Sequence, residues 1–533
     1  SIPAKEKLGK SLRSLWRQSN LRDLIESTCL KIGCLGMWND GFSAIHSILK
    51  FDCKTTTDDG EIERLKSIAE QLSPKTLIDD IRMYVLAEKW SFHDLEEFDD
   101  EGKLIEHGYK KGQQYAKELG LKLSSTDHEL FKGLLTELLS YDGTNSNLFE
   151  FGEGCAQDAQ NNEELLAITI STLEQLSEKE RNFDFLRGQI NYLSKNNTSL
   201  TNAFLDSLII HPTLKQHFIW VQLSYTIDSE AIVRIIKDLE ESISPIWMYK
   251  NLACGRRHES IPDAKFCDIL DLIWHQNDGQ EIVIDILSMR FHGLKQNKDY
   301  VVSVFLKKKA ASFLASFDYS KDRDHFTSKD YNFTQIANVC FSKNANEDHA
   351  ISVFTNIKKG ILDHVIGRID LPDFLSTMIQ MHPISALEVF IGEGVEVKPQ
   401  LRNAIKCRLD KKTSPFSNVD TQNTIAWCEN SREDRYPNLA SIITPYQSIE
   451  KTIEWTPLAI ELLENSPEPT KVLDEYSSSL HPTSWSGSRA KILESRLPLF
   501  HSLINHDNKG VSSWAINKEV QWKKNIAREY EKE

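Results

Sequence analysis

Short amphipathic stretches with the helical period follow one another along most of this chain, and the alternation typical of strands is scarce. Ile232, Ile235, Ile236 and Leu239 form one such apolar stripe, with Asp228 or Ser229 available as the cap before it. A single core normally stops growing at about 250–300 residues. Here 533 residues continue without an obvious linker. We therefore predict an all-α fold, an α-solenoid in which antiparallel helix pairs stack into a superhelix.

Composition supports this prediction. The 23 glycines and 16 prolines are fewer than strands joined by tight turns would need. The sequence contains no apolar run of the roughly 18–20 residues that span a bilayer, and its first residues lack the apolar stretch of a secretory signal. The 9 cysteines are dispersed and form no CxxC pair, which indicates reduced thiols. We expect a cytoplasmic protein with no membrane contact.

Two polar stretches interrupt the helical pattern, residues 318–332 and 411–436. We interpret both as surface loops and as the best candidates for module boundaries. The predicted division is an N-terminal helical segment over residues 1–160, a central helical-repeat segment over 161–325 and a C-terminal helical-repeat segment over 326–533.

The C-terminal region contains a repeat-like turn. A helix is expected to end at His506, and Asp507, Val511 and Ala515 follow at intervals of four residues. This pattern resembles the turn of a HEAT repeat. The succession of short amphipathic stretches along the chain is similar to that of HEAT and tetratricopeptide helical repeats. Ser512 stands where an Arg commonly follows the Val in that family. We expect Gly510 to permit a tight turn and residues 517–533 to form a polar capping helix.

Motifs for catalysis, cofactors and metals are absent or incomplete. Residues 4–11 match a relaxed phosphate loop only formally, because no strand can precede them. Cys254, His258, Cys267 and His275 do not have the spacing of a common zinc site, and we interpret them as packing and polar residues. We predict no catalytic residue, no metal site and no cofactor.

The charge pattern leaves two kinds of partner open. The formal net charge of −15 disfavours nonspecific binding of nucleic acids. Short basic runs occur at residues 256–258, 307–309, 358–359 and 411–412, and helix ends in solvent explain most of them. An acidic patch over residues 94–106 is either a solvated face or a docking surface for a basic partner.

Tryptophans and arginines are the best candidates for partner contacts. Of the 11 tryptophans, four lie within apolar patterns and are expected to pack in the core: Trp220, Trp247, Trp274 and Trp485. Any of them that is exposed would be a natural hot spot of an interface. The segment that begins at Trp485 is a polar insertion that either shapes a groove or caps a helix. We predict partner binding by five residues, Trp247, Arg256, Arg257, Trp485 and Arg489.

Three segments resemble the C-terminal sensor of bacterial anti-phage STAND NTPases, residues 244–253, 284–290 and 485–533. The resemblance implies that a phage protein binds the concave face and triggers upstream NTPase and effector domains, and it carries over no catalytic residue. We therefore predict a non-enzymatic protein-recognition scaffold, the ligand-sensing region of a larger bacterial defence or signalling protein. The alternatives are a nucleic-acid-binding helical-repeat protein and an enzyme whose site is assembled from dispersed residues.

Overall fold

The computed structural model describes the whole chain except residues 1–10, 13, 33–37, 54–57, 87–91, 93–94, 100, 102, 124–127, 294–300, 321–325, 343–344, 368–369, 394–395, 407–413, 450–451 and 483–484. The fold is all-α, apart from two small antiparallel hairpins among the described residues. The chain has two compact units, unit 1 (Ser1–Asn251) and unit 2 (Leu252–Glu533). The threefold division expected from the sequence stays a prediction.

Unit 1 consists of helices and one hairpin. Its elements are η1 (Ser19–Leu21), α2 (Arg22–Ile32), α3 (Trp38–Phe51), α4 (Asp59–Gln71), α5 (Leu77–Ile81), η3 (Arg82–Leu86), β1 (Glu97–Phe98), β2 (Leu104–Glu106), α6 (Gly108–Leu123), α7 (His128–Leu139), α8 (Ser146–Asp158), α9 (Asn162–Gln175), η5 (Glu178–Glu180), α10 (Asp184–Asn196), α11 (Thr198–Leu208), η6 (Lys215–His217), α12 (Phe218–Gln222) and α13 (Ser229–Glu240). The 3-10 helix η7 (Ile246–Ala253) begins in unit 1 and ends two residues beyond Asn251, the last residue of that unit.

Glycines let three helices of unit 1 approach at backbone distance. α8 packs against both α6 and α10. A Cβ atom on Gly154 of α8 would lie 2.1 Å from the carbonyl oxygen of Lys117 on α6. A Cβ atom on Gly188 of α10 would lie 1.9 Å from the carbonyl oxygen of Phe149 on α8. Since real Cβ atoms do not approach this closely, only glycine allows this packing.

Unit 2 is a stack of helix pairs followed by a more irregular end. Its elements are η8 (Arg257–Ser260), α14 (Asp263–Trp274), α15 (Gly279–His292), α16 (Val304–Ser316), α17 (Phe326–Cys340), α18 (Glu347–Leu362), α19 (Pro372–Met381), α20 (Pro383–Ile391), α21 (Pro399–Lys406), η10 (Pro415–Asn418), α22 (Thr421–Cys428), η11 (Glu429–Ser431), α23 (Arg432–Ile442), β3 (Tyr446–Ile449), β4 (Thr452–Trp455), α24 (Pro457–Asn465), α25 (Pro469–Ser479), α26 (Arg489–Glu494), α27 (Leu497–His501) and α28 (Lys509–Tyr530).

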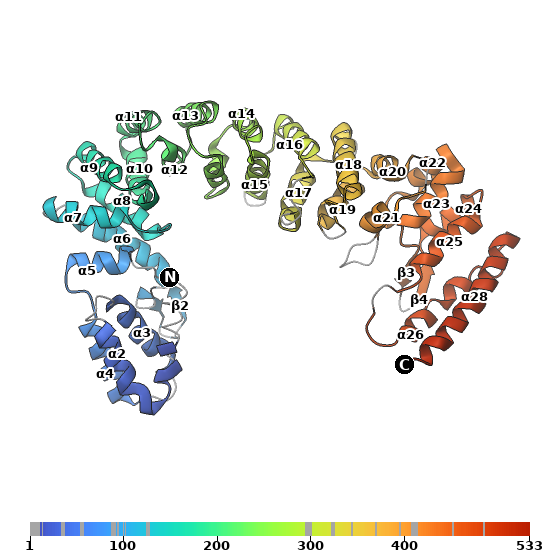
Figure 1. The fold of residues 1–533 in the computed structure, drawn as a ribbon, viewed down its shortest axis with the longest axis horizontal. Helices are drawn as coiled ribbons and strands as arrows, with labels where there is room; N and C mark the ends of the chain where they lie inside the picture. Colours follow the sequence, from blue (N-terminus) through green and yellow to red (C-terminus); the bar gives the residue numbers. More distant parts are fainter. Residues whose placement is uncertain are drawn as a thin grey trace. The chain divides into compact units, whose positions relative to one another are not determined.

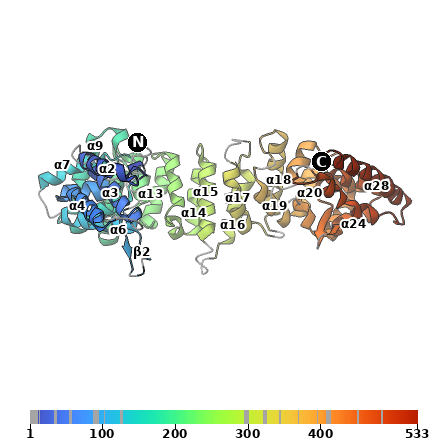
Figure 2. The same ribbon diagram turned by 90° about the horizontal axis from the view of Figure 1, so that it is seen from below.

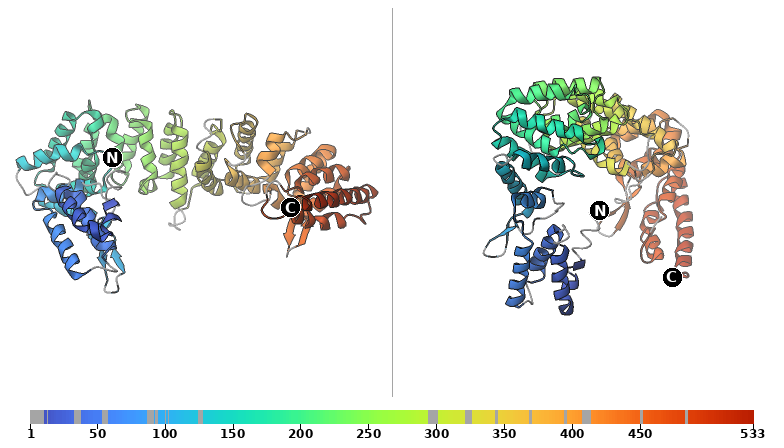
Figure 3. Two further views of the ribbon diagram at one scale, coloured as in Figure 1. Left: turned by 60° about the horizontal axis from the view of Figure 1, so that its bottom comes forward. Right: turned by 60° about the vertical axis from the view of Figure 1, so that its left-hand side comes forward.

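The stack has two layers. α14, α16, α18 and α20 each contact the next in one layer, and α15, α17 and α19 do the same in the other (Figure 1). Figure 2 shows the helices from α14 to α19 side by side in chain order. This arrangement confirms the predicted α-solenoid. At its C-terminal end the long helix α28 packs on α25, α26 and α27 (Figure 3).

The predicted loop over residues 318–332 is wrong in its second half, and the one over 411–436 is wrong in most of its length. α17 begins at Phe326, and α22 and α23 occupy much of the second stretch. Some of the polar side chains in these stretches bond to neighbouring helices. Arg435 of α23, for example, donates from Nη2 to the Oε2 atom of Glu388 on α20, 2.9 Å away.

The HEAT-like turn has the expected packing but a different cap. Val511 and Ala515 are fully buried in α28. The side chain of Asn508 caps this helix by accepting the backbone N–H groups of Gly510 and Val511. Gly510 therefore lies in the first helical turn, and its expected role in a tight turn is wrong. The outward side of α28 is not wholly polar, because Ile516 and Val520 are about half exposed.

Among the described residues, no individual helix has both the length and the apolar character needed to cross a bilayer. α19 and α20 are long and apolar enough only when taken together, and the chain bends by 114° between them.

Candidate protein-interaction surface

An exposed tryptophan, Trp485, and a half-buried arginine, Arg489, form an aromatic and cationic pair at the start of α26. The guanidinium carbon of Arg489 lies 4.7 Å from the centre of the Trp485 ring. The Nη1 atom of Arg489 also lies 3.2 Å from the Oε1 atom of Glu529 on α28. Trp485 remains 50% exposed. The contacts of Arg489 thus orient a large aromatic side chain that is open to solvent, as in the hot spots of protein interfaces.

The carboxylate of Glu529 strengthens this arrangement. Hydrogen bonds from Lys532, 2.9 Å away, and from Arg489 lower the pKa of Glu529. The carboxylate therefore stays ionised at neutral pH and keeps the Arg489 side chain against the indole.

Trp247 is the most exposed tryptophan of the described residues and lies on η7. It is 63% exposed and Trp485 is 50% exposed, so the expectation that these two tryptophans pack in the core is wrong. Met248 and Tyr249, beside Trp247, are buried. The Tyr249 hydroxyl donates to the Oδ2 atom of Asp238 on α13, which anchors η7 and leaves the indole outside. Trp247 is therefore held by its neighbours at the surface of unit 1.

Arg256 and Arg257 lie at the start of unit 2. Arg256 has a left-handed backbone conformation with φ of 59°, and its Nε atom donates to Glu259 over 2.8 Å. Arg257 is half-buried. Of the five predicted residues, the pair that the structure brings into contact is Trp485 and Arg489.

The basic runs do not supply a clear phosphate-binding groove. Lys309 of α16 lies 2.7 Å from Asp271 of α14, and Lys358 of α18 lies 2.5 Å from Glu393. Residues 411–412 lie outside the described part of the chain. Lys309 and Lys358 are therefore paired with acidic neighbours within unit 2.

The acidic patch coincides with the β1–β2 hairpin. Glu96 forms an ion pair with Lys50, and Glu97 lies 2.5 Å from Lys111. Asp99 accepts the backbone N–H of Lys103 over 2.7 Å, which shapes the turn. Part of the acidic patch thus forms ion pairs and hydrogen bonds within unit 1. Asp94 and Asp100 lie outside the described residues.

Two of the four residues considered for a metal site, His258 and Cys267, are buried in the helical packing, whereas Cys254 is exposed. His258 is buried, and its Nδ1 atom lies 2.9 Å from the carbonyl oxygen of Leu252. Cys267 is buried in α14. No set of three or more metal-ligating side chains occurs among the described residues. The phosphate-loop-like stretch lies outside the described residues except for Ser11.

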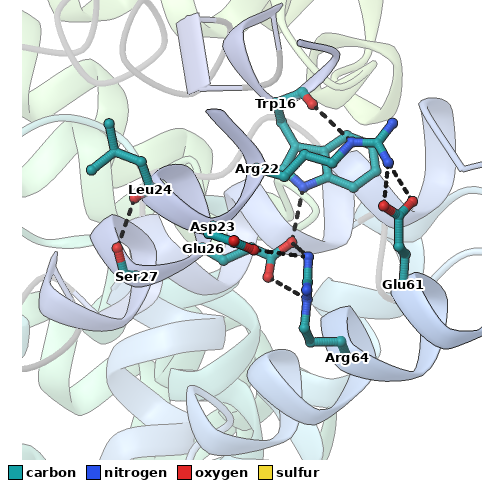
Figure 4. Close-up of polar contacts among 8 residues, drawn as sticks. All are labelled: Trp16, Arg22, Asp23, Leu24, Glu26, Ser27, Glu61 and Arg64. Carbon is teal, nitrogen blue, oxygen red and sulfur yellow. Dashed lines mark hydrogen bonds and ion pairs between the residues drawn. The ribbon is translucent and has the colours of Figure 1, made fainter. Parts of the chain in front are cut away.

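A charged cluster near the N-terminus is also structural. The Glu26 carboxylate is buried, accepts from the indole N–H of Trp16 over 3.2 Å and lies 2.7 Å from Nε of Arg64 (Figure 4). Arg22 stacks on the Trp16 ring at 4.5 Å and pairs with Glu61. These contacts join α2 to α4, and the carboxylates point at their partners rather than into a cavity.

One surface, on α15 and α17, was not predicted from the sequence. Lys329 of α17 lies 3.1 Å from Glu281 and 3.6 Å from Asp285, both on α15. Beside this charged group, Met289 is 42% exposed and Tyr331 is 53% exposed. Tyr331 lies in the stretch interpreted as a loop, and its proximity to α15 follows from the stacking of the pairs. No periodicity signal could have revealed it.

Comparison with known proteins gives little further guidance. No family model matches the chain, and no curated protein matches it. A chain from the crystal complex of SYS-1 and POP-1 is similar over 98% of this chain and 96% of that one, with 12% sequence identity and a TM-score of 0.20. These values assign no family and no activity.

Proposed function

We propose that this chain is a non-enzymatic protein-recognition scaffold and the ligand-sensing region of a larger bacterial defence or signalling protein. The observation that carries the proposal is the exposed Trp485, which Arg489 and Glu529 hold in place on a helical solenoid. Solenoids offer long surfaces to other macromolecules, and braced aromatic residues supply binding energy at low entropic cost. The sensing role rests on the resemblance to anti-phage sensors, in which a phage protein is the ligand.

Titration of the purified chain with purified phage proteins, and in parallel with duplex DNA, tests this proposal. Binding of a phage protein should be weakened about 30-fold by Trp485→Ala, because a hot-spot residue contributes about 2 kcal/mol or more. Arg489→Ala should weaken it less, since the indole remains but loses its support.

Ile351→Ala is a suitable control, since Ile351 is an exposed apolar residue of α18. This substitution should leave the affinity unchanged. Tight binding of DNA that falls steeply with salt, together with no binding of any protein, would show that the nucleic-acid alternative is correct.

A further inference from the structure

The hairpin of β3 and β4 leaves one strand edge open in unit 2. The hairpin projects from the neighbouring helices of this unit (Figure 3). β4 packs on α27, whereas three of the four residues of β3 are exposed, Gln447, Ser448 and Ile449. β3 is therefore the strand to which a further strand can be added.

The register of the hairpin shows which backbone groups of β3 point outward. The N–H of Thr456 donates to the carbonyl oxygen of Pro445 over 2.9 Å, just before β3 begins. In an antiparallel pair, residues that bond across the ladder alternate with residues whose N–H and C=O groups point away. Because Pro445 bonds across the hairpin, Tyr446 and Ser448 point their backbone groups outward. Among the described residues, these outward N–H and C=O groups have no hydrogen-bond partner.

The hairpin is anchored to the helices beside it. Trp455 of β4 is buried, and its indole N–H donates to the carbonyl oxygen of Leu499 on α27 over 3.0 Å. The guanidinium carbon of Arg496 lies 5.1 Å from the centre of the Tyr446 ring. An edge that is already held in place loses little conformational entropy when a partner strand adds to it.

A cavity of about 250 Å³ lies at the start of β3, where the hairpin meets η10, α22 and α24. None of the described residues that line it is charged. Its polar lining consists of four aliphatic hydroxyls and one amide besides the tyrosine, those of Ser417, Thr421, Thr444, Thr456 and Gln447. The volume lies below the range of ordinary small-molecule sites, so the cavity suits a single side chain better than a cofactor.

Three of these hydroxyl oxygens already accept backbone N–H groups. Oγ of Ser417 accepts the N–H of Thr444 over 3.1 Å, and Oγ1 of Thr444 accepts that of Ser414 over 2.9 Å. Oγ1 of Thr456 accepts the N–H of Ala459 over 3.3 Å. Each of these hydroxyls keeps its hydrogen for donation, so the cavity offers donors to a carbonyl oxygen.

We propose that a partner protein adds an extended segment to the outer edge of β3 and places an asparagine or glutamine side chain in the cavity. Main-chain hydrogen bonds to Tyr446 and Ser448 supply affinity, and the cavity supplies specificity. An amide side chain fits because its carbonyl oxygen accepts from hydroxyls and because it buries no charge. This inference rests on the proposed function, since it assumes a protein ligand, and it names the chemistry that this ligand presents.

A display library of random dodecapeptides, selected on the full chain, supplies the probe. The peptides that bind should be enriched in asparagine or glutamine. In the most enriched peptide, methylation of one backbone amide at a time should weaken binding about tenfold or more at alternate positions only. The reason is that every second N–H of an added strand points at β3, and the others point away from it.

Two substitutions at one position separate the backbone of β3 from its side chain. Ser448→Pro removes the outward N–H and should weaken binding of the same peptide about tenfold or more. Ser448→Ala keeps this N–H and should leave the affinity unchanged. The hairpin tolerates proline at this position because the N–H of Ser448 is not part of its own ladder. The methylated peptides test the same contact without any change in the chain.

A third substitution tests the cavity. Thr421→Val removes one hydroxyl from the lining and should weaken binding of the selected peptide about threefold to tenfold. Thr355→Val makes the same change on the exposed side of α18 and should leave binding unchanged.

Three outcomes overturn the proposal: no enrichment of amide side chains, no alternation in the effect of methylation, or equal binding to the wild type and the Ser448→Pro variant. A dimer of the chain that Ser448→Pro abolishes, together with no selected peptide, would show that a second copy occupies the edge instead. If a phage protein binds and depends on Trp485 but not on Ser448, the strand-edge proposal fails and the proposed function stands.

Discussion

The carboxylate of Asp330 on α17 accepts the backbone N–H of Phe374 in the first turn of α19, 2.8 Å away. It also accepts the N–H of Asp373 over 3.1 Å. α19 has no side-chain cap of its own, because the residue before it is Leu371. One helix of the solenoid thus supplies the cap of the next helix in its layer, and the two repeats are joined by hydrogen bonds as well as by apolar packing.

Replacing Asp330 should therefore loosen α19 rather than α17. Asp330→Ala leaves the buried N–H of Phe374 and the more exposed N–H of Asp373 without this acceptor, which should cost about 1–3 kcal/mol. Hydrogen exchange measured by mass spectrometry on the full chain should show faster exchange in peptides covering residues 372–381. The same peptides should be unaffected by Asp420→Ala, which removes the local cap of α22. Equal exchange in the wild type and the Asp330→Ala variant would contradict the capping role.

Two glycines of unit 1 should respond to the same substitution in opposite directions. Gly188→Ala would place a Cβ atom 1.9 Å from a backbone oxygen and should destabilise unit 1 by about 3 kcal/mol or more. Gly133 of α7 has nothing within 4 Å of the corresponding position. Gly133→Ala should stabilise the helix by about 0.5–1 kcal/mol. Urea unfolding of both variants measures the two effects, and a similar change in both would refute the close-packing argument.

The stability of unit 1 should depend on the protonation of Asp238. Burial raises the pKa of Asp238 to about 6 from 3.8, although hydrogen bonds from Tyr249 and Ser244 act in the opposite direction. Because the folded state binds this proton more tightly, the contribution to stability is fully present below pH 3.8 and is lost as the pH rises through 6.

Asp238→Asn imitates the protonated form and removes this dependence. The stability of the variant relative to the wild type should increase by about 2 kcal/mol between pH 4 and pH 7, since each pK unit corresponds to about 1.4 kcal/mol and part of the change occurs below pH 4. Urea unfolding at both pH values measures the difference. If the stability of the two proteins changes with pH in the same way, the ionisation of Asp238 does not destabilise unit 1, and the raised pKa of Asp238 is wrong.

Cysteine reactivity should follow burial. Cys254 is exposed, whereas Cys155, Cys267, Cys340 and Cys428 are buried. Burial raises the pKa of Cys267 and of Cys428 to about 12, so the reactive thiolate is scarce. Iodoacetamide should label Cys254 more than about tenfold faster than these four in the native chain. Peptide mapping gives the rates, and uniform labelling would show that the buried thiols are accessible.

The sequence predicted those helices whose apolar side chains repeat regularly. Ile232, Ile235 and Leu239 lie on α13, and Asp228 caps it by accepting the N–H of Ala231 over 2.8 Å. α17 was missed because its first turns are polar. Lys329 and Asp330 bond to residues more than 40 positions away, and local periodicity contains no information about such partners.

In the candidate site, too, contacts between residues close in the sequence differ from contacts between distant residues. Trp485 and Arg489 were both predicted as partner-binding residues, but Trp485 lies before the start of α26, so helical spacing does not explain their contact. Tyr331 meets His292 across 39 residues, and the cavity at the start of β3 takes side chains from η10, α22 and α24. These arrangements depend on how the helix pairs stack, which the pattern of one chain does not specify.

Asp330, which caps α19, is also synthesised before the helix that it caps. Asp330 leaves the ribosome 43 residues before Asp373, so its carboxylate is in place when the amides that need it emerge. At this point the solenoid can therefore lengthen from its N-terminal side, because α19 completes this polar contact on a helix that has already been synthesised.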